Sequence, residues 1–142
     1  MYIEGRQLKS AIKEAASVAR SVDKLPNRWG ATNKGILGFV AEHICVVEDR
    51  LYLGVNQPTG IAQRFVPTFR GTGIQYEEYV EHCDIDFTIL SDYEFSEEQW
   101  AMLWLTGQEQ GIGSSRGQGF GRYTITRWEQ ITEAPKRRST KK

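Results

Sequence analysis

The first regular pattern along the chain covers residues 7–20, QLKSAIKEAASVAR. Apolar residues recur there at intervals of three or four positions, and the stretch contains no glycine or proline. They are Leu8, Ala11, Ile12, Ala15 and Ala19. This spacing places them on one face of a helix, whereas strict alternation would indicate a strand. We therefore predict an amphipathic helix whose apolar face is buried.

A second helix is predicted from SEEQWAMLWLTG, residues 96–107. Ser96 suits the N-cap position, and Gln99 stands where a capping box requires it. Trp100, Leu103 and Trp104 share one face at helical spacing, which predicts that this face is packed against the core. Gly107 is expected to end the helix.

Strand patterns occur in three places. HICVV and RLYLG are rich in β-branched and aromatic residues and are separated by Glu48 and Asp49, which predicts a hairpin with a tight turn. DIDFTIL, residues 84–90, alternates apolar with polar residues and is typical of a half-buried strand. GRYTITRWEQI, which begins at Gly121, is predicted to be the last strand.

Two stretches lack a clear period. DKLPNRWGATNKG, residues 23–35, collects turn-forming residues and predicts a loop that displays Arg28 and Trp29. NQPTGIAQRFVPTFRGTG, residues 56–73, contains two prolines and three glycines. It indicates a long loop or an irregular extended excursion from the sheet.

The order of these elements indicates the fold class. Helix, hairpin, excursion, strand, helix, glycine-rich loop and strand together predict an α+β fold, a ferredoxin-like antiparallel sheet with two helices on one face. Such a fold begins with a strand, and only MYIEGR precedes Gln7. We expect this first strand to be missing or supplied by another segment or chain. The domain is expected to span residues 1–134, followed by a disordered basic tail, 135–142.

Composition narrows the class of protein. At 142 residues, with 39% hydrophobic and 25% charged residues, the chain has the composition of one water-soluble domain. It has no apolar run of bilayer length and no secretory signal pattern, so we expect a cytoplasmic protein that does not contact membranes. Cys45 and Cys83 lack the spacing of a zinc site and are expected to be buried thiols.

The charges sum to zero but are segregated along the chain. Residues 51–110 hold ten acidic residues and two arginines, whereas residues 111–142 hold eight basic and two acidic residues. Near the N-terminus, Lys9, Lys13 and Arg20 follow one another at helical spacing, with Arg6 just before them. This basic ridge suits either solvent or contact with phosphate. The segregation predicts that one face of the molecule meets a polyanion while the rest repels it.

Between the second helix and the last strand lies GIGSSRGQGFG, residues 111–121. Glycine-rich loops of nucleotide-binding motifs follow a strand and open a helix, and this loop does the reverse. No Gly-Lys-Ser/Thr closes it, so nucleotide hydrolysis is not expected. The five glycines instead indicate close approach to the backbone, either by a ligand or by another part of the fold.

Two motifs carry a resemblance to a known family. The arrangement helix, G-I-G-x-x-R-x-x-G-F-G, strand resembles the C-terminal glycine loop of the repeat-associated mysterious protein superfamily. YIEGRQLKSAIKEA is similar to the segment of CRISPR effector backbone subunits, the seventh Cas family, in which an isoleucine-proline-glycine turn leads into a lysine-bearing helix. Ile3, Gly5, Leu8 and Lys9 fit this pattern, and Glu4 stands in place of the proline. Small phage and prophage proteins share both motifs.

The resemblance implies a non-catalytic protein that binds RNA or single-stranded DNA, plausibly phage-encoded, without a cofactor or metal. It also implies a homo-oligomer or a larger ribonucleoprotein assembly. The residues expected to contact nucleic acid are Arg6, Lys9, Lys13, Arg28, Trp29, Gly111, Gly113, Arg116, Gly117, Gln118, Gly119, Phe120, Gly121 and Arg122. Phe65 and Phe69 are further candidates for base stacking.

Two alternatives remain open at the level of the sequence. The endoribonuclease branch of the superfamily uses a histidine without metal, which makes His43 and His82 the candidates for a small nuclease. His82, Asp84 and Asp86 also resemble a set of metal ligands, although a solvent-facing strand explains them more simply. The second alternative is a protein-interaction module whose acidic middle contacts a basic partner and interferes with a host defence complex.

Overall fold

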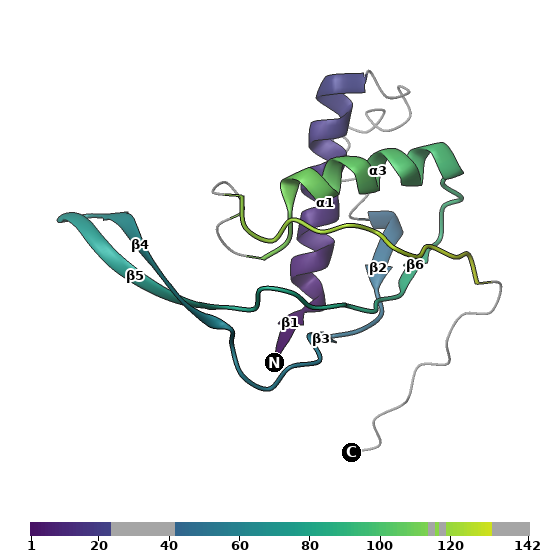
Figure 1. The fold of residues 1–142 in the computed structure, drawn as a ribbon. Helices are drawn as coiled ribbons and strands as arrows, with labels where there is room; N and C mark the ends of the chain where they lie inside the picture. Colours follow the sequence, from purple (N-terminus) through teal and green to yellow (C-terminus); the bar gives the residue numbers. More distant parts are fainter. Residues whose placement is uncertain (24–41, 114–115, 117–118, 132–142) are drawn as a thin grey trace, which may run out of the picture.

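The structure, a computed structural model, describes residues 1–23, 42–113, 116 and 119–131. Within them the chain forms two helices and three two-stranded antiparallel sheets, so the α+β class is confirmed (Figure 1). The elements in chain order are β1 (Tyr2–Glu4), α1 (Gly5–Asp23), β2 (Ile44–Val46), β3 (Arg50–Tyr52), β4 (Gly60–Thr68), β5 (Gly71–Tyr79), β6 (Ile89–Ser91) and α3 (Glu97–Gln110).

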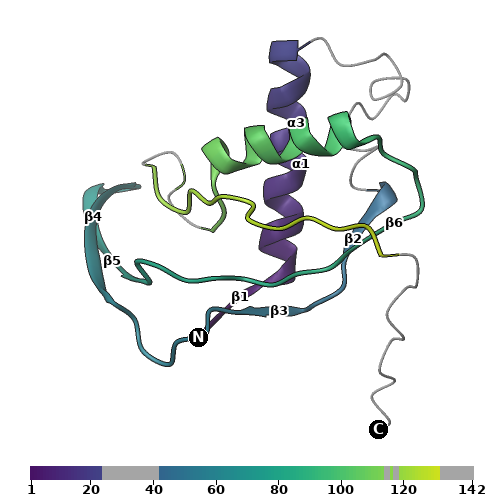
Figure 2. The same ribbon diagram turned by 45° about the vertical axis from the view of Figure 1, so that its right-hand side comes forward.

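Helix α1 confirms the amphipathic pattern. All five residues of the predicted apolar face are buried, and Ala16 joins them. The residues packed around this face include Ile44, Leu51, Phe95 and Leu103, and α3 crosses α1 in both views (Figures 1 and 2). Four of the seven buried positions described on α1 are alanines, whose short side chains allow neighbouring elements to approach closely.

Helix α3 begins as predicted and ends later. The Ser96 hydroxyl accepts a hydrogen bond from the backbone N–H of Gln99, and the Gln99 side chain accepts one from the N–H of Ser96. The expectation that Gly107 ends the helix is wrong, because α3 continues to Gln110 and is capped by Gly111 at φ 77°. Gly107 is buried within the helix, where a Cβ would overlap the hydroxyl of Tyr123.

Tyr123 gives a pH-dependent prediction. Burial raises its pKa to about 12, and its buried hydroxyl has no hydrogen-bond partner among the described residues. Between pH 10 and 12 an unfolded chain loses this proton while the folded chain keeps it, so the free energy of unfolding falls as pH rises. We expect Tyr123→Phe to remove part of that loss, measured by denaturant unfolding at pH 9 and 11.5. Tyr76→Phe, at an exposed position, should retain the full loss.

The short strands pair differently from the prediction. Residues of β2 and β3 do not form a hairpin with each other: β2 pairs with β6, and β3 pairs with β1. The backbone between β2 and β3 forms hydrogen bonds with two other segments: Asp49 O accepts from Gly5 N, and Val47 N donates to Thr88 O. The turn expected at Glu48 and Asp49 is therefore a crossing point between two small sheets.

The prediction of a long loop or irregular excursion over residues 56–73 is also wrong, because most of this stretch belongs to a regular hairpin. β4 and β5 make a regular hairpin of nine residues per strand, closed by the two residues Phe69 and Arg70. It projects from the rest of the molecule in both views (Figures 1 and 2). Pro67 lies at the exposed edge next to the turn, where a missing N–H is tolerated.

The two long strand patterns form extended chain with little pairing. Alternation in DIDFTIL is confirmed, because Ile85, Phe87 and Ile89 pack against the core while Asp84 and Asp86 are exposed. Within this stretch, however, only the residues of β6 pair with another strand. The last strand predicted from Gly121 is wrong as a strand assignment, since residues 122–131 have no paired strand among the described residues.

The cysteines lie at the surface. Both Cys45 and Cys83 are free and exposed, which contradicts the prediction of buried thiols. Cys45 points away from the core because its neighbour Ile44 takes the inward position on β2. Cys83 lies in the extended chain before β6, where burial and Asp84 raise the pKa of its thiol.

Candidate nucleic-acid interface

The two ends of the glycine-rich loop are joined to each other. Ile112 N donates to Gly121 O at 2.9 Å, and Gly111 packs directly on the backbone of Phe120 and Gly121. A Cβ at Gly121 would overlap the carbonyl oxygen of Ile112. The close approach that the sequence indicated is therefore, at these two glycines, an approach of the loop to itself.

Two other glycines are open to solvent. Gly113 and Gly119 adopt φ values of 90° and 86°, and a Cβ at either position would meet nothing within 4 Å. Their positive φ favours glycine through backbone conformation, with no crowding from the protein. These two positions are where a ligand could reach the backbone of the loop. Gly117 and Gln118, also expected in the interface, lie outside the described residues.

Arg116 ties the loop to the first helix. Its Nη1 and Nη2 atoms each lie 2.8 Å from a different carboxylate oxygen of Glu14, a bidentate ion pair between residues 102 positions apart in the chain. Glu14 is the one acidic residue in residues 7–20. The loop and α1 thus lie side by side, and the charge of Arg116 is matched by a carboxylate of the protein. The sequence prediction did not include Glu14. The feature that could have indicated it is its position as a single acidic residue in a basic helix.

Lys9 and Lys13 lie on another side of α1 from this ion pair. Consecutive helical residues are roughly 100° apart around the axis, so Lys13 and Glu14 point in clearly different directions. The positions between them on the helix surface are Arg6, Ser10 and Ser17, which are all exposed. On the surface of α1, Lys9 and Lys13 are therefore separated from the Arg116–Glu14 pair by these three exposed residues.

The expected cations differ in their pairing. Arg6 forms an ion pair with Glu4 through an exposed side chain. Lys9 and Lys13 are half-buried and Arg122 is exposed; within the described part of the chain none of these three has a carboxylate partner. Arg28 and Trp29 lie outside the described residues. The unpaired positive charge of the interface therefore rests on Lys9, Lys13 and Arg122.

Phe120 connects the loop to the β4–β5 hairpin. The guanidinium of Arg64 lies 4.1 Å from the centre of the Phe120 ring, and Arg64 also pairs with Glu77 of β5 at 2.9 Å. Arg64 is 9% exposed, the most buried charged residue among those described. The sequence prediction did not include Arg64, which fixes the side of the hairpin that faces the loop. One face of the Phe120 ring is therefore already covered by the Arg64 side chain.

The opposite side of the hairpin is apolar and exposed. Ile61, Phe65, Ile74 and Tyr76 share this side, because paired residues of an antiparallel ladder point the same way. Phe65 is 70% exposed, and Phe69 at the turn is fully exposed. Both aromatic rings are accessible, as base stacking requires.

The two histidines occupy different environments. Nδ1 of His43 lies 2.7 Å from the Asp92 carboxylate, and the ring packs against Tyr93. His82 is exposed in the chain before β6. No group of three potential metal ligands occurs within the described ranges, so His82, Asp84 and Asp86 do not form a metal cage there. In the same ranges no helix is long and apolar enough to span a bilayer.

Comparisons with protein-family models, with curated protein sequences and with solved structures found no match to this chain. The observations that bear on function are therefore its own residues and their arrangement.

Proposed function

We propose that this protein is a non-catalytic binder of RNA or single-stranded DNA. Its fold would be of ferredoxin-like type, similar to the backbone subunits of CRISPR effector complexes, and it would act in the cytoplasm, alone or as one subunit of a larger assembly. The observation that carries the proposal is the contact between the glycine-rich loop and α1 through Arg116 and Glu14. It brings the two segments that carry the family resemblance onto one side of the molecule.

The surface that results suits a sugar-phosphate strand in two respects. Gly113 and Gly119 leave the loop backbone accessible, and backbone N–H groups are common phosphate contacts. Lys9, Lys13 and Arg122 supply charge that no carboxylate of the described residues neutralises. Arg116, which pairs with Glu14, would position the loop in this arrangement, whereas the three unpaired cations would contact phosphates.

The experiment measures the salt dependence of binding to fluorescein-labelled 20-nucleotide poly(U) and poly(dT). The triple variant Lys9→Ala, Lys13→Ala, Arg122→Ala removes the three unpaired cations and leaves the Arg116–Glu14 pair in place. Each lost phosphate contact lowers the slope of log K against log salt by about 0.7 for a single strand. We therefore expect the slope to fall by about two and the affinity in low salt to fall at least tenfold.

Arg127→Ala is the matched control. Arg127 is an exposed arginine that pairs with Glu129 and belongs to the segment after the loop, so its loss should leave slope and affinity unchanged. An unaltered slope in the triple variant would reject the proposal. The same samples, incubated with EDTA, show whether the RNA stays intact; cleavage that His43→Ala abolishes would replace the proposal with a metal-independent nuclease.

A further inference from the structure

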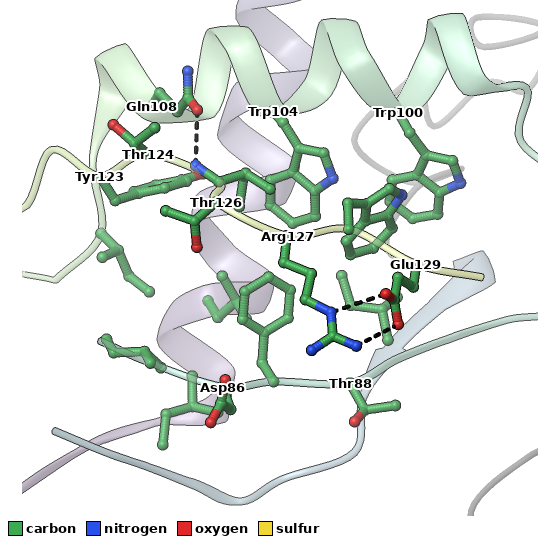
Figure 3. A pocket seen from close by; sticks show the side chains of 18 of the residues that line it. Asp86, Thr88, Trp100, Trp104, Gln108, Tyr123, Thr124, Thr126, Arg127 and Glu129 are labelled. Atoms are coloured by element: carbon green, nitrogen blue, oxygen red, sulfur yellow. Dashed lines mark hydrogen bonds and ion pairs between the residues drawn. The ribbon is translucent and has the colours of Figure 1, made fainter. Parts of the chain in front are cut away.

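A large groove lies beneath α3 and shares only its Arg122 end with the cations of the candidate nucleic-acid interface. One side is formed by residues 80–91 and the other by residues 121–131, with α3 above the second segment (Figure 3). Its volume is about 2680 Å³. Sites for small molecules usually measure about 300 to 1,000 Å³, so this groove has the size for a piece of polypeptide.

The backbone on both sides of the groove lacks partners. Among the described residues, 82–87 and 122–131 form no backbone–backbone hydrogen bond. Neither segment belongs to a helix or a strand, both follow drawn-out paths in Figures 1 and 2, and on one side the chain leads straight into β6. Free N–H and C=O groups along extended chain are the feature that allows another strand to add to a sheet.

The orientation of one hydrogen bond indicates which groups face the groove. Ile125 N donates to the Gln108 side chain on α3 at 2.9 Å. In a regular extended chain successive N–H groups point in opposite directions, so we expect those of Thr124 and Thr126 to point away from α3. In Figure 3 this is the direction of Asp86 and Thr88 across the groove.

Aromatic rings line the groove. Trp104 lies 5.6 Å from Phe87 and 5.1 Å from Trp128, so a single aromatic cluster touches both sides and α3. Trp104 is 5% exposed, and its indole N–H has no acceptor among the described residues. A buried N–H without a partner is costly, and a carbonyl of an added strand is a suitable acceptor. Trp128 remains 40% exposed and would be covered.

The charge around the groove is mainly negative. The lining contains two arginines, Arg122 and Arg127, and six carboxylates, Glu81, Asp84, Asp86, Glu94, Glu97 and Glu129. Arg127 already pairs with Glu129 at 2.9 Å. This balance opposes a nucleic acid and favours a partner that carries basic residues on its solvent-facing side.

We propose that this groove accepts a β-strand from a partner protein, which pairs with residues 82–87 on one edge and 122–131 on the other. The strand alternates apolar residues, directed at the aromatic cluster, with basic or neutral polar residues, directed at the solvent and the rim carboxylates. Phe87 and Trp128 already approach to 6.3 Å across the cluster, so the apolar residues are of the size of valine or leucine. The proposal does not depend on nucleic-acid binding.

Hydrogen exchange of the full chain tests the proposal with two synthetic nine-residue peptides, acetyl-KVTVKVTVK-amide and its leucine counterpart. We expect at least one of them to slow exchange of the backbone amides in both segments, including Thr124 and Thr126. Calorimetry should show at least tenfold weaker binding when glutamate replaces lysine in the peptide. N-methylation of alternate amides should abolish binding, because it removes the ladder hydrogen bonds and leaves the side chains unchanged.

Thr126→Pro removes one groove-facing N–H at an exposed position and should weaken peptide binding at least tenfold, whereas Thr126→Ala keeps the N–H and should bind normally. The N-methylated peptide gives the same test without altering the protein. Protection confined to one segment, protection of the β4–β5 hairpin, or no binding by either peptide would overturn the proposal. Protection of both segments by poly(U) would also overturn it. So would concentration-dependent self-association that protects both segments, since the strand would then come from a second copy.

Discussion

Replacing Gly121 with alanine should destabilise the protein more than the same substitution at Gly113 or Gly119. Gly121 has φ 75°, and an alanine costs about 1–2 kcal/mol in that region. The added Cβ would also overlap the Ile112 carbonyl oxygen and disturb the bond from Ile112 N to Gly121 O. That bond contributes about 1 kcal/mol. Denaturant unfolding should therefore show a loss of about 3 kcal/mol.

Gly119→Ala separates the two causes. Gly119 has a similar φ of 86°, but a Cβ there meets nothing within 4 Å, so it should cost only the conformational part, about 1 kcal/mol. If both variants lose the same stability, the loop ends do not meet as described. The Gly121 variant should also bind nucleic acid more weakly, because the loop would no longer be held beside α1.

Gly5→Ala should have a comparable effect through contact alone. Gly5 begins α1, is buried, and donates its N–H to Asp49 O at 2.9 Å. A Cβ would overlap the carbonyl oxygen of Glu48, which is backbone and can move only if the crossing point between β2 and β3 moves with it. Overpacking of this kind costs about 1–3 kcal/mol. Thermal or denaturant unfolding should show a loss near the upper end of that range.

Gly54→Ala provides the contrast for Gly5. Gly54 has φ 70° with open space around it, so its substitution carries a conformational cost and no overlap. Gly5→Ser, which adds one more atom at the crowded position, should be at least as harmful as Gly5→Ala. A neutral Gly5→Ala variant would show that the start of α1 is not packed against residues 48–49.

Gly5 and Gly121 belong to the two sequence motifs on which the expectation of nucleic-acid binding rests, and in this structure both are required by close contacts within the protein. Among the described glycines of the loop, Gly113 and Gly119 have no such contacts. A role in ligand binding should therefore be sought at these two positions and at the unpaired cations.

The local elements followed directly from the sequence. The period of the apolar residues located α1 and its buried face, the capping box at Ser96 located the start of α3, and alternation identified which side of residues 84–90 is buried. Each of these depends on residues within a few positions of one another, where helix and strand geometry relate spacing to direction.

What the sequence by itself determined is therefore the class of fold, the two helices and the buried face of α1. The tertiary structure decided the pairing of β2 with β6 and of β3 with β1, the pairing of Arg116 with Glu14, and the groove between residues 80–91 and 121–131. The physical reason is that strand partners and ion pairs join residues far apart in the chain. Local patterns specify which side of a segment is buried, but the partner of its backbone depends on where the helices bring the other segments.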